Sequence, residues 1–405
     1  MAKKEHHNLK QTNARFSVRG QLQKVGEDKF FNLKPAGGPD GRKKAFAKCT
    51  MAVKTSADNV VYGIEISGNE QDTVRYSYKT QEGTQNVDIK WTDRYNEKIV
   101  NALIPQGAEA KISFAKSIGL SRETYIDKKD GDKEKERIAR KQLTGYDAVL
   151  EIKKAVDEGR LADGTSVYIG GNIKPNTFSF KNDDGETITT KRIALEAGSM
   201  SLAATPVVFG EMSEEDIDKS SSFVMDVVIK EFNEVDGVIY MTGIYVGYDC
   251  IEEIEFKFTT PELANGFKTV FTPHLKKGIY PMIPCAGVIK LETIEEAVTE
   301  EVPTGTTGLL GDFKKYTTTR KGKSKQYFVI GGGDEGRIDL ESYTVEKVEE
   351  AKEQIKAWKN DFKEGKDVAD EVEMTAPTVS LGNISAYASD ETLDDFDDEE
   401  EWDGI

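Results

Sequence analysis

Basic and aromatic side chains are interleaved through the N-terminal part of the chain. The interleaved residues are Arg19, Phe30, Phe31, Arg42, Lys43, Lys44, Phe46, Lys48, Lys54, Arg75, Tyr76, Tyr78 and Trp91. Single-stranded nucleic acid needs cations along its phosphates and flat side chains on which its unstacked bases can lie. On a β-strand, Lys44, Phe46 and Lys48 would share one face, so that an aromatic ring is flanked by two cations. These residue types predict a nucleic-acid-binding surface.

The basic residues stand out because the chain as a whole is acidic. Its 405 residues carry a formal net charge of −17, yet residues 1–54 hold 13 Lys and Arg against 4 Asp and Glu. Such an asymmetry indicates a polyanionic partner for the basic part. For any single aromatic residue, a place in the hydrophobic core beside solvent-facing lysines is the simpler explanation. The conjunction of all of them in the one basic region favours the binding surface.

The last sixteen residues, Asp390–Ile405, combine dense negative charge with spaced apolar residues. Ten of them are Asp or Glu, and Leu393, Phe396, Trp402 and Ile405 interrupt the charge. A run of like charge cannot collapse into a core, so the segment is expected to be disordered and extended. It is either a solubilising tail or a docking peptide that inserts its apolar residues into a partner protein. As a docking peptide it would also act as an electrostatic decoy for the basic surface.

Short segments of alternating apolar and polar residues, separated by Gly, Pro and Asp turns, predict small antiparallel barrels or sandwiches. The openings of two such regions are loosely alike, FSVRGQL with FFNLK against VYIGGNI with FSFK, which suggests two related β-domains in tandem. Both openings place a Gly in mid-strand, as a tightly curved barrel strand requires. The predicted divisions are a flexible arm at 1–13, a basic β-domain at 14–120, a connector containing a helix at 121–162, a second β-domain at 163–300, a linker with a basic hairpin and a helix at 301–370, and a disordered acidic tail at 371–405.

Signatures of enzymes and metal sites are missing from the sequence. The only histidines are His6, His7 and His274, too few for a His-based metal site. The glycine-rich segment 328–336 lacks the Lys-Ser/Thr of a phosphate-binding loop and the G-x-G-x-x-G spacing. The acidic segment 127–136 lacks the order of a calcium-binding loop. We therefore expect no catalytic residues, no cofactor and no metal.

The cysteines and the apolar segments bear on the compartment. Cys49, Cys250 and Cys285 are odd in number and scattered, so they predict neither a disulfide framework nor a zinc site. The N-terminus lacks the apolar region of a signal peptide, and no apolar run approaches the length of a membrane span. We expect a soluble cytoplasmic protein without membrane contact.

The C-terminal sequence EEEWDGI, following a basic β-domain, resembles phage-type single-stranded DNA-binding proteins. The bacterial proteins of this class end in DDDIPF, and here the same order of acids, an aromatic residue and a terminal apolar residue lacks the Pro-Phe ending. The resemblance implies a mainly β fold of tandem oligonucleotide-binding (OB) antiparallel barrels, with connector helices and a disordered acidic tail. It implies that the protein coats and protects single-stranded DNA during phage DNA replication or recombination, in the host bacterial cytoplasm. Trp402 and Ile405 would then dock polymerase, helicase or recombination proteins.

Three other classes stay open on the sequence alone. A phage structural or assembly protein would share the two β-domains and bind no DNA. A DNA mimic would inhibit a DNA-binding enzyme through the acidic surface of residues 151–405, and a nuclease would turn over its nucleic acid. The second β-domain, being acidic, is expected to serve in spacing or protein contact, and the oligomeric state is left unspecified.

Overall fold

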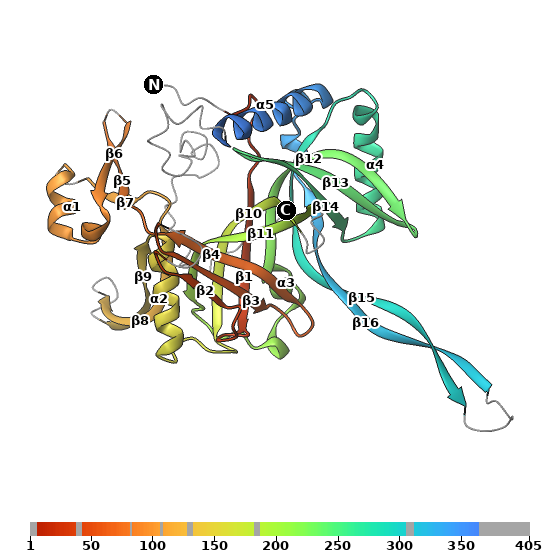
Figure 1. Ribbon diagram of the computed structural model, residues 1–405, viewed down its shortest axis with the longest axis horizontal. Helices are drawn as coiled ribbons and strands as arrows, with labels where there is room; N and C mark the ends of the chain where they lie inside the picture. The colour runs from red at the N-terminus through yellow and green to blue at the C-terminus, as the bar shows by residue number, and fades with distance from the viewer. Residues whose placement is uncertain are drawn as a thin grey trace.

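A computed structural model describes residues 6–37, 43–81, 83–105, 108–127, 133–181, 187–304 and 312–363. Five strands and one helix of the N-terminal half form a first barrel (Figure 1). They are β1 (Ala14–Gln23), β3 (Phe46–Lys54), β4 (Val60–Asn69), α2 (Gly145–Asp157), β10 (Ser166–Lys181) and β11 (Thr187–Leu202). Neighbouring strands pair in the order β1-β3-β4-β11-β10 and back to β1, and all pairs are antiparallel except β4 with β11. The short strand β2 (Phe31–Lys34) pairs with the outer edge of β3.

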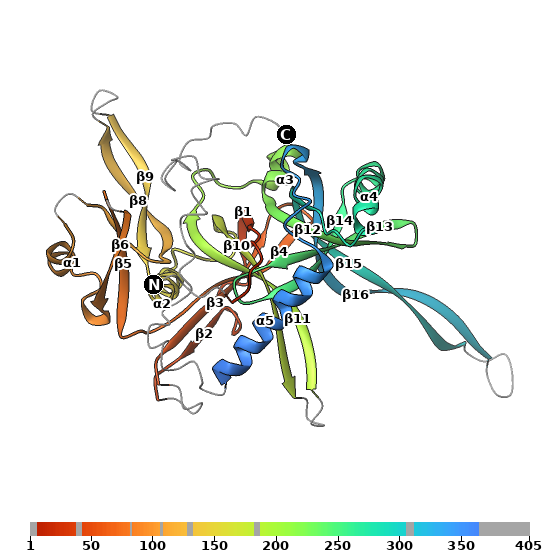
Figure 2. The same cartoon turned by 90° about the horizontal axis from the view of Figure 1, so that it is seen from above.

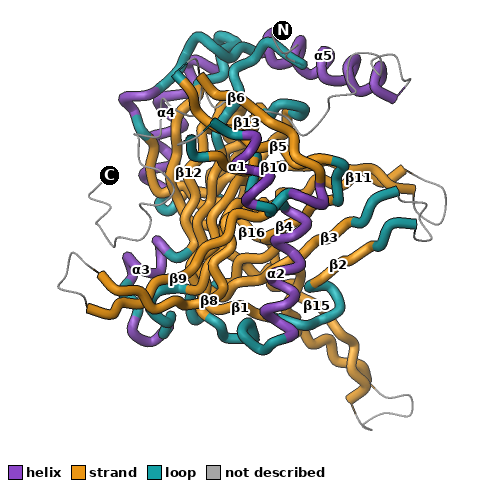
Figure 3. The backbone as a smooth tube through the Cα atoms, turned by 90° about the vertical axis from the view of Figure 1, so that its left-hand side faces the viewer, coloured by secondary structure: helices purple, strands orange, loops and turns teal. Residues whose placement is uncertain are grey.

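Alternation of apolar and polar residues builds the core of this barrel. In β1, Ala14, Phe16 and Val18 are buried while the residues between them are more exposed. Helix α2 packs against β3 and β4 and buries an apolar stripe that includes Val149 and Ile152 (Figure 3). A barrel with its helix between the third and fourth strands is the OB arrangement expected from the sequence.

A second barrel of the same order follows. Its elements are β12 (Ser221–Val235), β13 (Val238–Val246), β14 (Ile251–Phe258), α4 (Pro261–Leu275), β15 (Met282–Thr304) and β16 (Asp312–Gly333). The pairing runs β12-β13-β14-β16-β15 and back to β12, again with one parallel pair, β14 with β16. The mainly β fold with tandem OB-like barrels is thus confirmed.

Glycines allow close strand crossings where the sequence predicted curvature. A Cβ atom added at Gly20 would lie 2.1 Å from the carbonyl oxygen of Lys54, and one added at Gly171 would lie 2.1 Å from that of Glu196. Only glycine fits at such contacts, because a side chain would collide with neighbouring backbone.

The two barrels are joined by strand pairing and by the half-buried side-chain amide of Asn59. Residues Ala14–Val18 of β1 pair with Ser221–Met225 of β12, so the barrels share one 13-stranded sheet. The side chain of Asn59, in the β3–β4 turn, donates to the carbonyl of Ile289 at 3.0 Å and accepts from the amide of Leu291 at 2.9 Å.

Strand pairing within the first barrel corrects the predicted domain boundaries. The strands and helix between Gly145 and Leu202 belong to the first barrel, where the sequence predicted a connector at 121–162 and a second domain beginning at 163. The second barrel starts at Ser221. The alternation in β10 and β11 defines strands but carries no information on which barrel they close.

An insert of small elements separates β4 from α2. It contains β5 (Thr73–Thr80), β6 (Gly83–Lys90), η1 (Trp91–Asp93), α1 (Glu97–Leu103), β7 (Ala110–Ile112), β8 (Lys116–Asp127) and β9 (Lys133–Leu143). Strands β5, β6 and β7 form a three-stranded sheet, whereas β8 and β9 form a hairpin that joins the large sheet where β8 pairs with β11. Figure 2 shows this insert at the opposite end of the molecule from the β15–β16 ribbon.

The β15–β16 hairpin extends beyond the second barrel as a two-stranded ribbon (Figure 1). Its register places Glu296 opposite Arg320 and Glu301 opposite Lys315. The basic residues that the sequence placed in a hairpin of their own thus lie on the single strand β16, opposite a strand rich in Glu. Strand β15 also runs through residues 301–304, where the sequence predicted a linker. The remaining helical elements are η3 (Phe209–Glu211), α3 (Glu214–Lys219), η4 (Glu335–Arg337) and α5 (Val345–Lys363).

Residues 6–13 are packed, and for them the predicted flexible arm is wrong. His7 and Leu9 are buried, and the His7 ring donates from Nε2 to the carbonyl of Gly247 at 2.7 Å. Tyr343 donates to the carbonyl of Lys10 at 2.9 Å. Leu9, the single apolar side chain of this segment, joins a buried hydrophobic cluster that includes Tyr343. The polar residues around Leu9 in the sequence did not suggest this burial. The predicted acidic tail at 371–405 lies outside the described residues.

Candidate nucleic-acid interface

The outer face of β3 carries two members of the central predicted triplet. Ala47, Cys49 and Met51 point into the barrel, so Phe46 and Lys48 point outward. The half-buried Lys44 lies in the bend that precedes the strand. The strand period alone predicts this arrangement.

A carboxylate lies between two cations on this face. Glu65, on β4, accepts from Lys48 at 2.7 Å through one carboxylate oxygen and from the Arg192 guanidinium through the other. Its side chain is only 11% exposed. Burial, together with the charge of Arg192, lowers the pKa of Lys48, while Glu196 acts in the opposite direction. Arg192 lies on β11, and the pairing of β11 with β4 brings it beside Glu65. The spacing of residues along the sequence could not predict this contact.

Two predicted stacking residues belong to the core instead. Phe30 is 3% exposed within the first barrel, and Tyr76 is 7% exposed in the core of the insert, with its hydroxyl bonded to the carbonyl of Arg94. Neither ring can lie against a base, so these two predictions are wrong. Phe31 is half-buried, and the Lys153 ammonium lies 5.8 Å from its ring centre.

The other predicted cations are distributed more widely. Lys43 is exposed, and Lys44 forms an ion pair with Asp72 at 2.6 Å. Lys54 lies over the ring of Phe209 at 5.1 Å. Arg19 lies 3.5 Å from the carbonyl of Thr205, and Arg42 lies outside the described residues.

Arg75, Tyr78 and Trp91 belong to the insert and not to the first barrel. Arg75 is held by Asp88 through two bonds of 2.9 and 3.0 Å, and Tyr78 is half-buried on the same strand. The guanidinium of Arg94 stacks over Trp91 at 4.0 Å.

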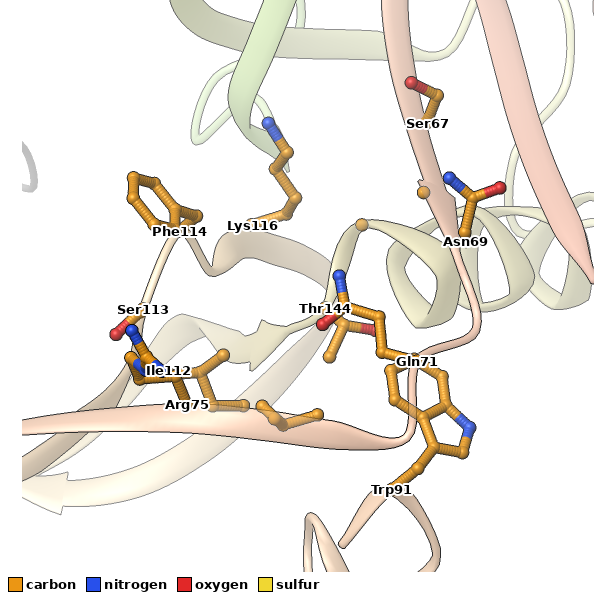
Figure 4. Close-up of a pocket in the computed structure, with 13 residues that line it drawn as sticks. Ser67, Asn69, Gln71, Arg75, Trp91, Ile112, Ser113, Phe114, Lys116 and Thr144 are labelled. Carbon is orange, nitrogen blue, oxygen red and sulfur yellow. The ribbon is translucent and has the colours of Figure 1, made fainter. Parts of the chain in front are cut away.

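A cavity of about 210 Å³ opens between the insert and the end of β4 (Figure 4). Its lining comprises Ser67, Gly68, Asn69, Gln71, Val74, Arg75, Trp91, Ile112, Ser113, Phe114, Lys116, Thr144 and Gly145. Arg75 and Trp91 were predicted from the sequence. Phe114 and Lys116 were missed, because each is an isolated residue outside the basic and aromatic clusters.

The structure adds two observations on other predicted features. Within the described ranges, no three His, Cys, Asp or Glu side chains gather where a metal ion could be held, and Cys49, Cys250 and Cys285 form no disulfide. Among helices in the described part of the chain, none is long and apolar enough to cross a membrane.

The fold and this face define a tandem OB-barrel protein with a basic, aromatic strip on its first barrel. The chain belongs to the YorF family, whose model matches residues 107–365. No curated protein compared with the chain matches it.

Two solved structures show remote similarity. A deletion mutant of the single-stranded DNA binding protein from Thermus aquaticus aligns with a TM-score of 0.28 and 8% identity, covering 70% of this chain and 88% of that chain. P47 of Clostridium botulinum E1 aligns with a TM-score of 0.08 and 8% identity, covering 87% of this chain and 88% of that chain. Scores this low establish neither a shared fold nor a shared function.

Proposed function

We propose that the chain binds single-stranded DNA along the outer face of β3, β4 and β11. The observation that carries this proposal is the outward pair Phe46 and Lys48 on β3, preceded in the chain by Lys44, to which strand pairing adds Arg192. The protein would coat and protect exposed strands during DNA replication or recombination in the cytoplasm. It would catalyse no reaction.

The chemistry of the strip suits a flexible polyanion. A stacked base contributes about 1–3 kcal/mol on an aromatic ring and tolerates any sequence. Lys48 and Arg192 already hold one anionic group, the Glu65 carboxylate, so a phosphate competes with Glu65 for the same donors. Release of counterions from the strand makes the affinity fall as salt rises.

The acidic tail has a second role in this proposal. Phe396, Trp402 and Ile405 would dock replication or recombination proteins, and the acidic residues between them would compete with DNA for the basic strip. DNA binding would then release the tail to its partners.

The test is anisotropy of a labelled oligo-dT with the full chain and with Lys48→Ala/Arg192→Ala. We expect at least tenfold weaker binding and a salt slope shallower by about 1.4, at roughly 0.7 for each phosphate that the variant no longer neutralises. The matched control, Lys219→Ala/Lys268→Ala, removes the same charge from surface ion pairs on α3 and α4. Equal weakening in the two variants would overturn the proposed face.

A further inference from the structure

The cavity beside the insert continues the face of β3 and β4. In the antiparallel register, Asn69 is opposite Phe46 and Ser67 is opposite Lys48. Directly opposed residues in a sheet point to the same side. Ser67 and Asn69 also line the cavity (Figure 4). A DNA strand that follows Phe46 and Lys48 therefore reaches its opening.

Phe114 stands in this cavity in a strained conformation. Its side chain is 51% exposed and its φ is +59°, a left-handed value that is uncommon for a residue other than glycine. The backbone on either side is fixed, since Ser113 donates to the carbonyl of Arg75 at 2.8 Å and Ala115 donates to that of Ile112 at 3.1 Å. Strain of this kind persists where the surroundings impose it, and it gathers at ligand sites.

Lys116 supplies an available cation in the same cavity. Its side chain is half-buried, and among the residues that the structure describes its ammonium has no hydrogen-bond or ion-pair partner. Burial lowers the pKa of its ammonium, and the charge of Glu196 opposes that effect. An ammonium carries three donors, so its group is open to an oxygen acceptor of a ligand.

We infer that this cavity holds one unstacked base of single-stranded nucleic acid, with the base against Phe114 and Lys116 bonded to an oxygen of the same nucleotide. The inference rests on the proposed function. The volume of about 210 Å³ is below the roughly 300–1,000 Å³ of sites for drug-sized ligands, which suits one base rather than two. The Ser67 hydroxyl and the Asn69 amide, which line the cavity, offer donors and acceptors to the base edge.

The test compares two labelled strands of equal length and charge, oligo-dT and a fully abasic strand. For Phe114→Ala we expect oligo-dT binding to weaken about 5- to 150-fold, the equivalent of one stacked base, while abasic binding stays unchanged. Leu103→Ala, an exposed apolar truncation on α1 of the same insert, is the matched control and should change neither. Equal binding of oligo-dT by wild type and Phe114→Ala would overturn the inference.

A second variant separates ligand binding from support of the fold. Phe114→Gly suits the positive φ, so we expect its melting temperature to equal or exceed that of wild type while oligo-dT binding weakens as in Phe114→Ala. A lower melting temperature with unaltered oligo-dT binding would make Phe114 structural and contradict the inference. If wild type binds neither strand, the proposed function itself fails. If wild type binds oligo-dT and the Phe114 substitutions leave that binding unchanged, only the base site is rejected.

Discussion

At the scale of single residues, Glu65 restrains the cations that would meet DNA. Glu65→Gln removes the charge that holds Lys48 and Arg192. Two such surface ion pairs are together worth about 1–2 kcal/mol, so we expect roughly 5- to 25-fold tighter oligo-dT binding and a steeper salt slope. Anisotropy titration measures both. The control Glu215→Gln, which frees Lys219 on α3, should leave the affinity and the salt slope unchanged. Weaker oligo-dT binding by Glu65→Gln would contradict competition between Glu65 and the DNA phosphates.

A matched pair of phenylalanines separates DNA binding from core packing. Phe46→Ala should weaken oligo-dT binding by about 1–3 kcal/mol with little change in stability, because its ring lies on the outer face. Phe30→Ala should lower the free energy of unfolding by about 3–5 kcal/mol, because its ring is buried. Urea unfolding and anisotropy of both variants provide the check; the reverse pattern would reject the assigned orientations.

Sequence alternation could predict the outward residues of β3 but could not separate Phe30 from its neighbour. Phe30 precedes β2, which begins at Phe31, so no strand period fixes which ring is buried. Arg192 could not be predicted either, since its place beside Lys48 depends on a strand far along the chain.

At the scale of elements, Asp147 fastens the insert to helix α2. Its carboxylate accepts from Arg94 at 2.8 and 2.7 Å, from Tyr95 at 2.7 Å and from Thr144 at 2.7 Å. The Asp147 side chain is 12% exposed. Asp147→Asn leaves the Arg94 charge without its partner, so we expect stability to fall by about 2–4 kcal/mol in urea unfolding. Asp88→Asn, in a more exposed pair with Arg75, should cost less than about 1 kcal/mol.

The same carboxylate makes stability depend on pH. Burial alone would raise the pKa of Asp147, but the hydrogen bonds from Arg94, Thr144 and Tyr95 outweigh it and hold the pKa below its usual value. The unfolded chain therefore binds this proton at higher pH than the folded chain. The stabilisation is complete above the ordinary carboxyl range and disappears as pH falls through the lowered value. The stability gap between wild type and Asp147→Asn should narrow on acidification, and a gap constant with pH would contradict this assignment.

The element types were largely predictable and their partners were not. Alternation of apolar and polar residues identified the strands, and apolar residues at helical spacing, ending near Gly159, identified α2. Closure of each barrel depends on a parallel pair, β4 with β11 and β14 with β16, which joins segments that nothing in the local sequence relates.

At the scale of the whole molecule, a basic strip on the first barrel coexists with a chain of net charge −17. A chain ending at Ala388 lacks the acidic segment Asp390–Ile405, and we expect it to bind oligo-dT more tightly at low salt because the competing charge is gone. The difference should vanish at high salt. Affinity unaltered by truncation at all salt concentrations would leave the tail as a docking peptide only.

The most direct test of the central claim is anisotropy of labelled oligo-dT with the full chain across a salt series, with duplex DNA of equal length as competitor. The strip of cations and outward aromatic rings predicts tight binding that weakens linearly on a logarithmic salt scale and that duplex competes for poorly. Absence of binding at low salt, or binding that duplex displaces as well as single strand does, would contradict single-stranded DNA binding by the first barrel.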